Sequence, residues 1–337
     1  MRIRATFPIA LAVVVIAAAV MLAVQLRKHA PPEPARLLPS ADGFLYANFG
    51  WARRASSGKG FFPVPHDPEY ERFIQETGFD YERDLDAVAF AVHYPQHWPG
   101  GGTGGSAPEP RFSEVFIARF DTGKLVTYLK HIAQSVDNYH SVDIYSIPLY
   151  GRTFRIAILG VDIVAASNQD DAAVIRGMVD RSRRLASPFG GPAMLRRYFK
   201  RVQLASPVWL MARVDPSAPA FEGWSDFLSH PADMVVSASY NPLHLPLRSG
   251  VLHVRAEAWA ASIDDARAIT QKLNTFLSTF HSAEASVGSP GTDADVKTLF
   301  DSLQARQEGT RAVLSATLPT DVFRKLVDSG QGSSPSR

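Results

Sequence analysis

The chain has 337 residues, of which 46% are hydrophobic and 20% are charged, and it contains no cysteine. This apolar content is sufficient for a folded core, which excludes a wholly disordered protein. The absence of cysteine excludes disulfide bonds, a cysteine nucleophile and an anchor made by lipid modification of a cysteine.

The formal net charge of +2 does not describe the folded part of the chain. Four of the 35 basic residues, Arg2, Arg4, Arg27 and Lys28, flank an apolar N-terminal segment, and the first acidic residue is Glu33. The remainder therefore holds 31 basic residues against 33 acidic ones. Because nucleic-acid binding calls for a basic surface, nucleic acid is excluded as the general partner.

Residues 5–26 form an uncharged, mostly apolar stretch of 22 residues. As a helix it would be about 33 Å long, enough to cross a hydrocarbon core of about 30 Å. A cleaved signal peptide is one alternative, but Arg27 and Lys28 stand where small residues are needed, and Pro31 and Pro32 follow. A buried core helix is the other, and it would have a polar face, which this stretch lacks. We expect a transmembrane anchor at 5–26.

The flanks of this anchor indicate its orientation. Two basic residues and the amino terminus precede it and two basic residues follow it, so the positive-inside rule is nearly balanced. A very short N-terminal tail ahead of the first apolar segment usually stays in the cytoplasm. We therefore expect a single-pass protein of the cytoplasmic (inner) membrane, with an extracytoplasmic, periplasmic C-terminal domain.

A Pro-rich linker at 27–37, expected to act as a stiff spacer, leads into a first half at 38–187. Asp121 is a helix-capping residue, and Leu125, Leu129 and Ile132 follow on one face, which predicts a helix to residue 135. The other elements expected in this half are strands at 43–49, 87–92, 114–120, 142–147, 153–158 and 162–166, helices at 69–76 and 168–184, and a Gly-rich loop at 99–110.

The second half, 188–329, has a similar order of elements. Its clearest strand is 250–259, where apolar residues alternate with polar ones. A tail at 330–337 consists mainly of Gly, Ser and Pro and is expected to be disordered. The elements expected in this half are strands at 207–213, 233–240, 250–259 and 311–318, and helices at 262–280, 293–303 and 319–327.

Runs of strands and runs of helices, in place of strict alternation, predict an α+β fold with antiparallel sheets and packed helices. Strand-to-helix transitions recur near Asp170 and near Asp321. This recurrence favours two related halves that arose by duplication. The alternative is that strand-then-helix order is common in unrelated proteins.

Short turn and strand-entry motifs mark the first half. They are Leu38-Pro39, Asp42-Gly43-Phe44-Leu45-Tyr46, Thr77-Gly78-Phe79-Asp80, Asp84-Leu85-Asp86-Ala87-Val88, Arg119-Phe120-Asp121 and Asp143-Ile144-Tyr145. On these motifs, the first half resembles a loosely defined group of uncharacterised, single-pass membrane-anchored bacterial envelope proteins. The resemblance implies an α+β extracytoplasmic domain of unknown role, and it brings no catalytic residue with it.

Two motifs that could hold a cofactor or a metal lack the required context. Gly100, Gly102 and Gly105 match the spacing of the dinucleotide fingerprint, but a Pro-containing segment follows where the phosphate-binding helix must begin. On a helix, His93 and His97 would present two imidazoles to one metal, but the Pro between them prevents a regular helix. We expect no cofactor and no metal site.

Acidic residues alternate at Asp80, Glu82, Asp84 and Asp86. Such a series could bind calcium or supply an acid and a base, but an apolar strand follows at once and breaks the calcium-loop pattern. Capping and solvation at a turn is the preferred interpretation. The chain also lacks the G-x-S-x-G motif of a serine nucleophile.

The sharpest charge asymmetry lies in residues 176–201, where eight basic residues face Asp180 alone. Such a segment could contact anionic lipid, an anionic cell-wall polymer or an acidic protein. The alternative is a solvated helical surface. The candidate contact residues are Arg176, Arg181, Arg183, Arg184, Arg196, Arg197, Lys200 and Arg201.

The sequence therefore favours a non-catalytic, membrane-anchored binding or scaffold protein over an enzyme. One alternative is an envelope hydrolase with a site assembled from dispersed residues, which requires a pocket that gathers a Ser or His with a carboxylate. Another is a chaperone-like factor for exported proteins, which requires an exposed apolar groove.

Overall fold

A computed structural model describes residues 30–55, 66–95, 111–149, 151–183, 191–240, 251–287, 299 and 301–319. The predicted anchor at 5–26, the glycine motif and the tail at 330–337 lie outside these residues. Within the described part of the chain, no helix is long and apolar enough to span a membrane.

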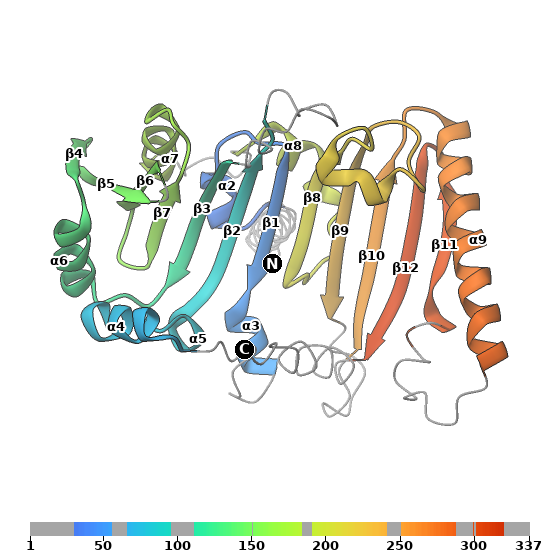
Figure 1. Ribbon diagram of the computed structural model, residues 1–337, viewed down its shortest axis with the longest axis horizontal. Coiled ribbons are helices and arrows are strands. Elements are labelled where there is room, and N and C mark those ends of the chain that lie inside the picture. Colours follow the sequence, from blue (N-terminus) through green and yellow to red (C-terminus); the bar gives the residue numbers. More distant parts are fainter. Residues whose placement is uncertain are drawn as a thin grey trace, which may run out of the picture.

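The described strands form a single 12-stranded sheet in the order β11-β12-β10-β9-β8-β1-β2-β3-β7-β6-β5-β4 (Figure 1). Each pair of neighbours in this order is antiparallel. The strands are β1 (Gly43–Asn48), β2 (Leu85–His93), β3 (Arg111–Ala118), β4 (Ser135–Tyr139), β5 (Val142–Leu149), β6 (Arg152–Ile158), β7 (Ile163–Ser167), β8 (Val208–Val214), β9 (Ala232–Tyr240), β10 (Val251–Trp259), β11 (Gln304–Glu308) and β12 (Arg311–Pro319).

Helices pack on both faces of this sheet, which confirms the predicted α+β class (Figure 1). They are α2 (Glu33–Leu37), α3 (Phe49–Ala55), α4 (Pro68–Thr77), α5 (Tyr81–Asp84), α6 (Thr122–Ile132), α7 (Ala173–Arg183), α8 (Ala193–Tyr198) and α9 (Ile263–Val287), with 3-10 turns η1 (Phe199–Arg201) and η2 (Pro219–Trp224).

The two faces are distinguished by the alternation of side chains along each strand. On one face, Tyr46, Ala89 and Val115 contact α2, α7 and α8 in the largest apolar cluster of the described chain. We call this the α2 face. On the opposite face, α6 covers β5, β6 and β7, and α9 covers the far end at β10 and β12. We call this the α9 face.

The halves predicted at 38–187 and 188–329 meet at the centre of the sheet. Strand β1 pairs with β8, with Leu45 opposite Leu210 at the middle of the register. The backbone hydrogen bonds of the sheet therefore run without interruption from the first half into the second.

Several predicted elements differ from the observed ones; the helix predicted at 168–184, for example, begins only at Ala173, as α7. Residues 33–37, placed in the linker, form α2, in which Pro34, Ala35 and Leu37 are buried. Proline in the first helical turn removes no helical hydrogen bond, and the apolar residues that follow pack on the sheet. The spacer expected at 27–37 is shortened by these residues.

The helix predicted for 121–135 ends at Ile132. Residues Ser135–Tyr139 form the edge strand β4 instead, because they pair with β5. Val136, Asp137 and Asn138 are weak helix formers, so this pairing outweighs the continuation of the helix.

Candidate binding surface

Seven of the eight predicted basic contact residues lie in the described chain, on helices α7 and α8 and the 3-10 turn η1 of the α2 face; Arg184 lies outside it. Helix α7 is held by buried Ile175, Met178 and Val179. Helix α8 is held by buried Leu195 and Tyr198. Because both helices are amphipathic, their basic residues are displaced from the sheet. The seven residues are Arg176, Arg181 and Arg183 on α7, Arg196 and Arg197 on α8, and Lys200 and Arg201 on η1.

Arg181 differs from the other six. Its Nε donates to the Leu37 carbonyl oxygen at 2.7 Å, and its Nη2 is buried without a partner among the described residues. Burial lowers the pKa of this guanidinium. Arg181 therefore joins α7 to α2 and does not present its charge to a partner.

The remaining six basic side chains are exposed, and none forms an ion pair with a described residue. Three of them lie over aromatic rings: Arg176 over Tyr139, Arg197 over Tyr198 and Arg201 over Trp259, at 5.6, 5.0 and 5.1 Å from the ring centroids. Such stacking fixes the stem of each side chain while its charge stays in water.

Asp180, the acidic residue of the segment, is already engaged. Its carboxylate accepts a hydrogen bond from the Tyr139 hydroxyl at 3.2 Å and lies 3.3 Å from Nδ1 of His140. It therefore leaves the neighbouring arginines of α7 available to an external anion. We call the six exposed residues the cationic surface: Arg176, Arg183, Arg196, Arg197, Lys200 and Arg201.

The described chain begins on this same α2 face. Ala30 and Pro32 line a cavity of about 170 Å³ over strands β1 and β8. The turn that follows η1 also lines it, and there Leu204 is 58% exposed while Ala205 has a left-handed φ of 58°. The full lining is Ala30, Pro32, Tyr46, Phe199, Val202, Gln203, Leu204, Ala205, Ser206 and Trp209.

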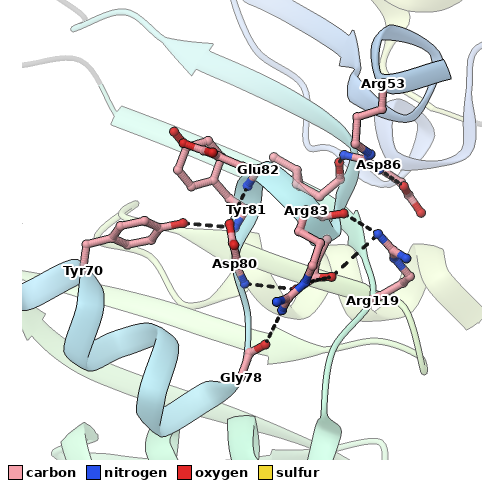
Figure 2. Close-up of polar contacts among 11 residues, drawn as sticks. Arg53, Tyr70, Gly78, Asp80, Tyr81, Glu82, Arg83, Asp86 and Arg119 are labelled. Atoms are coloured by element: carbon pink, nitrogen blue, oxygen red, sulfur yellow. Dashed lines mark hydrogen bonds and ion pairs between the residues drawn. The ribbon is translucent and has the colours of Figure 1, made fainter. Parts of the chain in front are cut away.

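The acidic series at 80–86 makes polar contacts with neighbouring residues of the fold, and Figure 2 shows this region. Asp80 caps α5 by accepting from the Glu82 N–H at 3.0 Å. Asp84 accepts from Arg83 at 2.6 Å and from the Asp80 N–H at 3.1 Å. Asp86 pairs with Arg53. Among the described residues, no group of three or more His, Asp or Glu could hold a metal ion.

Burial of Asp84 opposes its charge, but hydrogen bonds from Arg83 and the Asp80 N–H, together with the charges of Arg83 and Arg119, outweigh this and lower its pKa. The Arg119 guanidinium lies 3.7 Å from the carboxylate. Asp84 therefore stays ionised as a structural anion, which is the opposite of what a general acid requires.

His93, one of the two candidate metal ligands, lies instead beside a serine pair; His97 is outside the described residues. The Nε2 atom of His93 is 3.4 Å from Oγ of Ser113, and this Oγ is 3.0 Å from Oγ of Ser167. Ser113 is 0% exposed, so no substrate reaches its hydroxyl. Burial lowers the pKa of His93. This cluster satisfies hydrogen bonds inside the sheet.

A second serine, histidine and aspartate group sits at the start of α9. The Asp265 N–H donates to Oγ of Ser262 at 3.0 Å, and that hydroxyl donates to the Asp265 carboxylate at 2.8 Å. His230 contacts the other carboxylate oxygen at 3.1 Å. The hydroxyl therefore faces the carboxylate and not the imidazole, which is the geometry of a helix cap and not of an activated nucleophile.

The middle of the α9 face, between α6 and α9, carries apolar side chains that are partly exposed. Phe112, Val208 and Leu210 are 38–42% exposed. Glu114 is on the same face, opposite Phe90 in the β2–β3 register, and burial raises its pKa to about 7. The alternation in β3 and β8 is visible in the sequence, but only the sheet order and register place these residues on one face.

Comparisons with known proteins give no family for the chain. No family model matches it, and no curated protein matches it. Two crystal structures of TP0453 are similar to it at 10% identity, with crystal form III giving a TM-score of 0.46 over 89% of this chain and 99% of that one. Crystal form IV gives a TM-score of 0.44 over 88% of this chain and 97% of that one. A likeness at this level carries no conclusion about ligand or activity.

Proposed function

We propose that the protein is a membrane-anchored, extracytoplasmic binding or scaffold protein without catalytic activity, and that its cationic surface contacts an anionic partner. One observation supports this most directly: six exposed basic side chains share the α2 face without an acidic partner among the described residues. An anionic partner would supply the missing complementary charge.

The hydrolase alternative has less support. Ser113, which lies beside His93, is buried, and Ser262, which lies beside Asp265, is committed to a helix cap. A nucleophile needs both an accessible hydroxyl and a base that receives its proton. Neither serine combines these properties.

The anchor and the location are part of the proposal. The apolar stretch at 5–26 and its basic flanks support a single-pass protein of the inner membrane, with the described domain in the periplasm. The resemblance of the first half to membrane-anchored envelope proteins is consistent with this placement.

We also propose that the two halves are related by duplication. In the first half, β1-β2-β3 form a meander, α6 follows, and β7 returns to pair with β3. In the second half, β8-β9-β10 form a meander, α9 follows, and β12 returns to pair with β10. The first half then differs mainly by the additional strands β4 and β5.

Binding of a polyanion tests the functional proposal. Full-length protein in nanodiscs of neutral lipid is titrated with fluorescent polyphosphate, and binding is followed by anisotropy. The variant R196E/R197E/K200E/R201E is expected to lose at least about tenfold in affinity, since charge reversal replaces attraction by repulsion. The control R72E/K124E/K130E/R267E makes the same change in net charge at exposed residues of α4, α6 and α9.

Equal affinity of the two variants would contradict a role for the cationic surface, because it would show that only net charge matters. If both variants kept the affinity of the wild type for polyphosphate, the proposal that basic side chains attract an anionic partner would be contradicted. Circular dichroism of each variant verifies that the fold is retained.

A further inference from the structure

The point at which the chain enters the folded domain restricts how the domain sits on a membrane. Ala30 and Pro32 lie on the α2 face over β8 and β1, which are the fifth and sixth of the 12 strands counted from the β11 edge. The chain therefore enters at the middle of a broad face and not at an edge.

The connection between the predicted anchor and this entry point is short. Four peptide steps separate Leu26, the last residue of the apolar stretch, from Ala30. A fully extended chain advances at most about 3.6 Å per residue, so Ala30 is held within about 14 Å of the end of the span. A longer spacer is not available, because residues 33–37 are packed in the core as α2.

The cationic surface lies on both sides of this entry. On one side, α7 is bonded to α2 through Arg181 and Leu37. On the other side, Gly191 at the start of α8 packs so closely on α2 that a Cβ there would lie 3.4 Å from Cα of Arg36. In Figure 1, α2, α7 and α8 all lie at the upper part of the domain.

The segment after α8 brings charge closest to the entry. Phe199 and Val202 line the same cavity as Ala30, and the two residues between them, Lys200 and Arg201, are exposed. Leu204, which is 58% exposed, lies in the turn that follows η1. Basic residues next to an exposed Leu are typical of segments that lie in a membrane interface.

From these relationships we propose that the α2 face lies against the anionic headgroups of the bilayer that holds the anchor. The cationic surface contacts those headgroups, Leu204 enters the interface, and the α9 face points away from the membrane. This inference rests on the anchor of the proposed function and assigns its anionic partner to the lipid surface.

Distance explains why lipid is favoured over a soluble acidic partner. Charges in physiological salt act over a Debye length of about 8 Å, and the entry point is held within about two such lengths of the membrane. Anionic headgroups are therefore always at high local concentration beside the cationic surface. A soluble partner would have to displace them.

The absence of cysteine allows single labels to test this orientation in the full-length protein. Ala193→Cys places a label at the exposed start of α8, and Asn274→Cys places one on the exposed side of α9. Each labelled protein is reconstituted into phosphatidylcholine vesicles with and without phosphatidylglycerol, and energy transfer to a headgroup-linked acceptor is measured. Labelling after reconstitution with an impermeant maleimide selects outward-facing domains.

In vesicles with phosphatidylglycerol, transfer is expected to be higher from position 193 than from position 274. This excess should fall at high salt, in phosphatidylcholine alone and in R196E/R197E/K200E/R201E, but not in R72E/K124E/K130E/R267E. Equal transfer from both positions would overturn the proposal, and so would an excess that depends neither on lipid charge nor on salt.

Extraction with alkaline carbonate separates this failure from failure of the anchor. If the protein stays in the membrane but energy transfer from position 193 does not exceed that from position 274, the docking proposal is wrong and the anchor is retained. Protein that is released from the vesicles disproves the anchor, and the docking proposal falls with it.

Discussion

Tyr46 stacks on Trp209 with ring centroids 5.5 Å apart and an interplanar angle of 20°. The two residues are direct partners in the β1–β8 register, where the first half of the chain meets the second. Trp209 is 2% exposed and belongs to the largest apolar cluster. This ring pair therefore joins β1 to β8 through buried side chains on the α2 face.

Trp209→Ala should destabilise the protein by about 3–5 kcal/mol, the usual cost of replacing a buried aromatic residue by alanine. Urea unfolding of the full-length protein in neutral detergent, followed by circular dichroism, measures this change. Trp224→Ala is the control, since Trp224 is 42% exposed, and it should cost less than about 1 kcal/mol. A similar cost for both would contradict the central role of the Tyr46–Trp209 pair.

Arg181 and Arg183, two residues apart on α7, should behave in opposite ways. Arg181→Met removes the hydrogen bond to the buried Leu37 carbonyl and should cost about 1–3 kcal/mol of stability. Arg183→Met alters an exposed residue and should leave stability within about 0.5 kcal/mol. Polyphosphate titration should show the reverse, with weaker binding only for Arg183→Met. If Arg181→Met alone weakened binding, the division between structural and surface cations would be incorrect.

Asp84→Asn tests the structural role of the acidic series. Asp84 is 6% exposed and bonded to Arg83, so the loss of its charge should cost about 1–3 kcal/mol at neutral pH. Because its pKa is lowered by folding, the stability from its charge is present above the ordinary pKa and is lost as pH falls through the lowered value. The difference between variant and wild type should therefore shrink in acid.

Asp86→Asn is the matched control for that measurement. The Asp86 side chain is 45% exposed in its pair with Arg53, and exposed pairs contribute about 0–1 kcal/mol. Equal costs for the two substitutions, or a difference independent of pH, would contradict the assignment of Asp84 as the buried structural anion.

Glu114 should make stability depend on pH in the opposite sense. Burial raises its pKa from 4.5 to about 7, so the folded protein holds a proton that the unfolded chain has lost. Stability should fall as pH rises from about 4.5 to about 7, by at most about 3 kcal/mol, and then level off. Glu114→Gln should abolish this dependence, while Glu76→Gln, at an exposed position, should retain it. If the stability of Glu114→Gln still declined over this pH range, the pH dependence would come from another titrating group.

Local patterns in the sequence were sufficient to predict most strands of the sheet. The alternation of apolar and polar residues at 250–259 predicts a strand, and β10 is observed at Val251–Trp259. The alternation arises because the apolar residues of β10 face α9. Asp121 was expected to cap a helix, and it accepts from the Lys124 N–H at 3.1 Å. These features depend on neighbours a few residues away, which a single sequence contains.

Features that depend on distant contacts were not predictable. Helix α2 exists because Ala35 and Leu37 fit against the sheet, and its prolines alone suggested an extended spacer. The basic segment was visible as a charge run, but only the fold separates Arg181, bonded to Leu37, from its exposed neighbours. The entry of the chain at the middle of the α2 face likewise required the pairing of β1 with β8.

The central claim is that a single N-terminal anchor holds this domain outside the cytoplasmic membrane. Protease accessibility in intact spheroplasts, with an epitope tag placed after Arg337, tests it most directly. The account predicts that external protease digests the tagged domain before lysis. Protection of the tag until the spheroplasts are lysed would contradict the account and place the cationic surface on the cytoplasmic side.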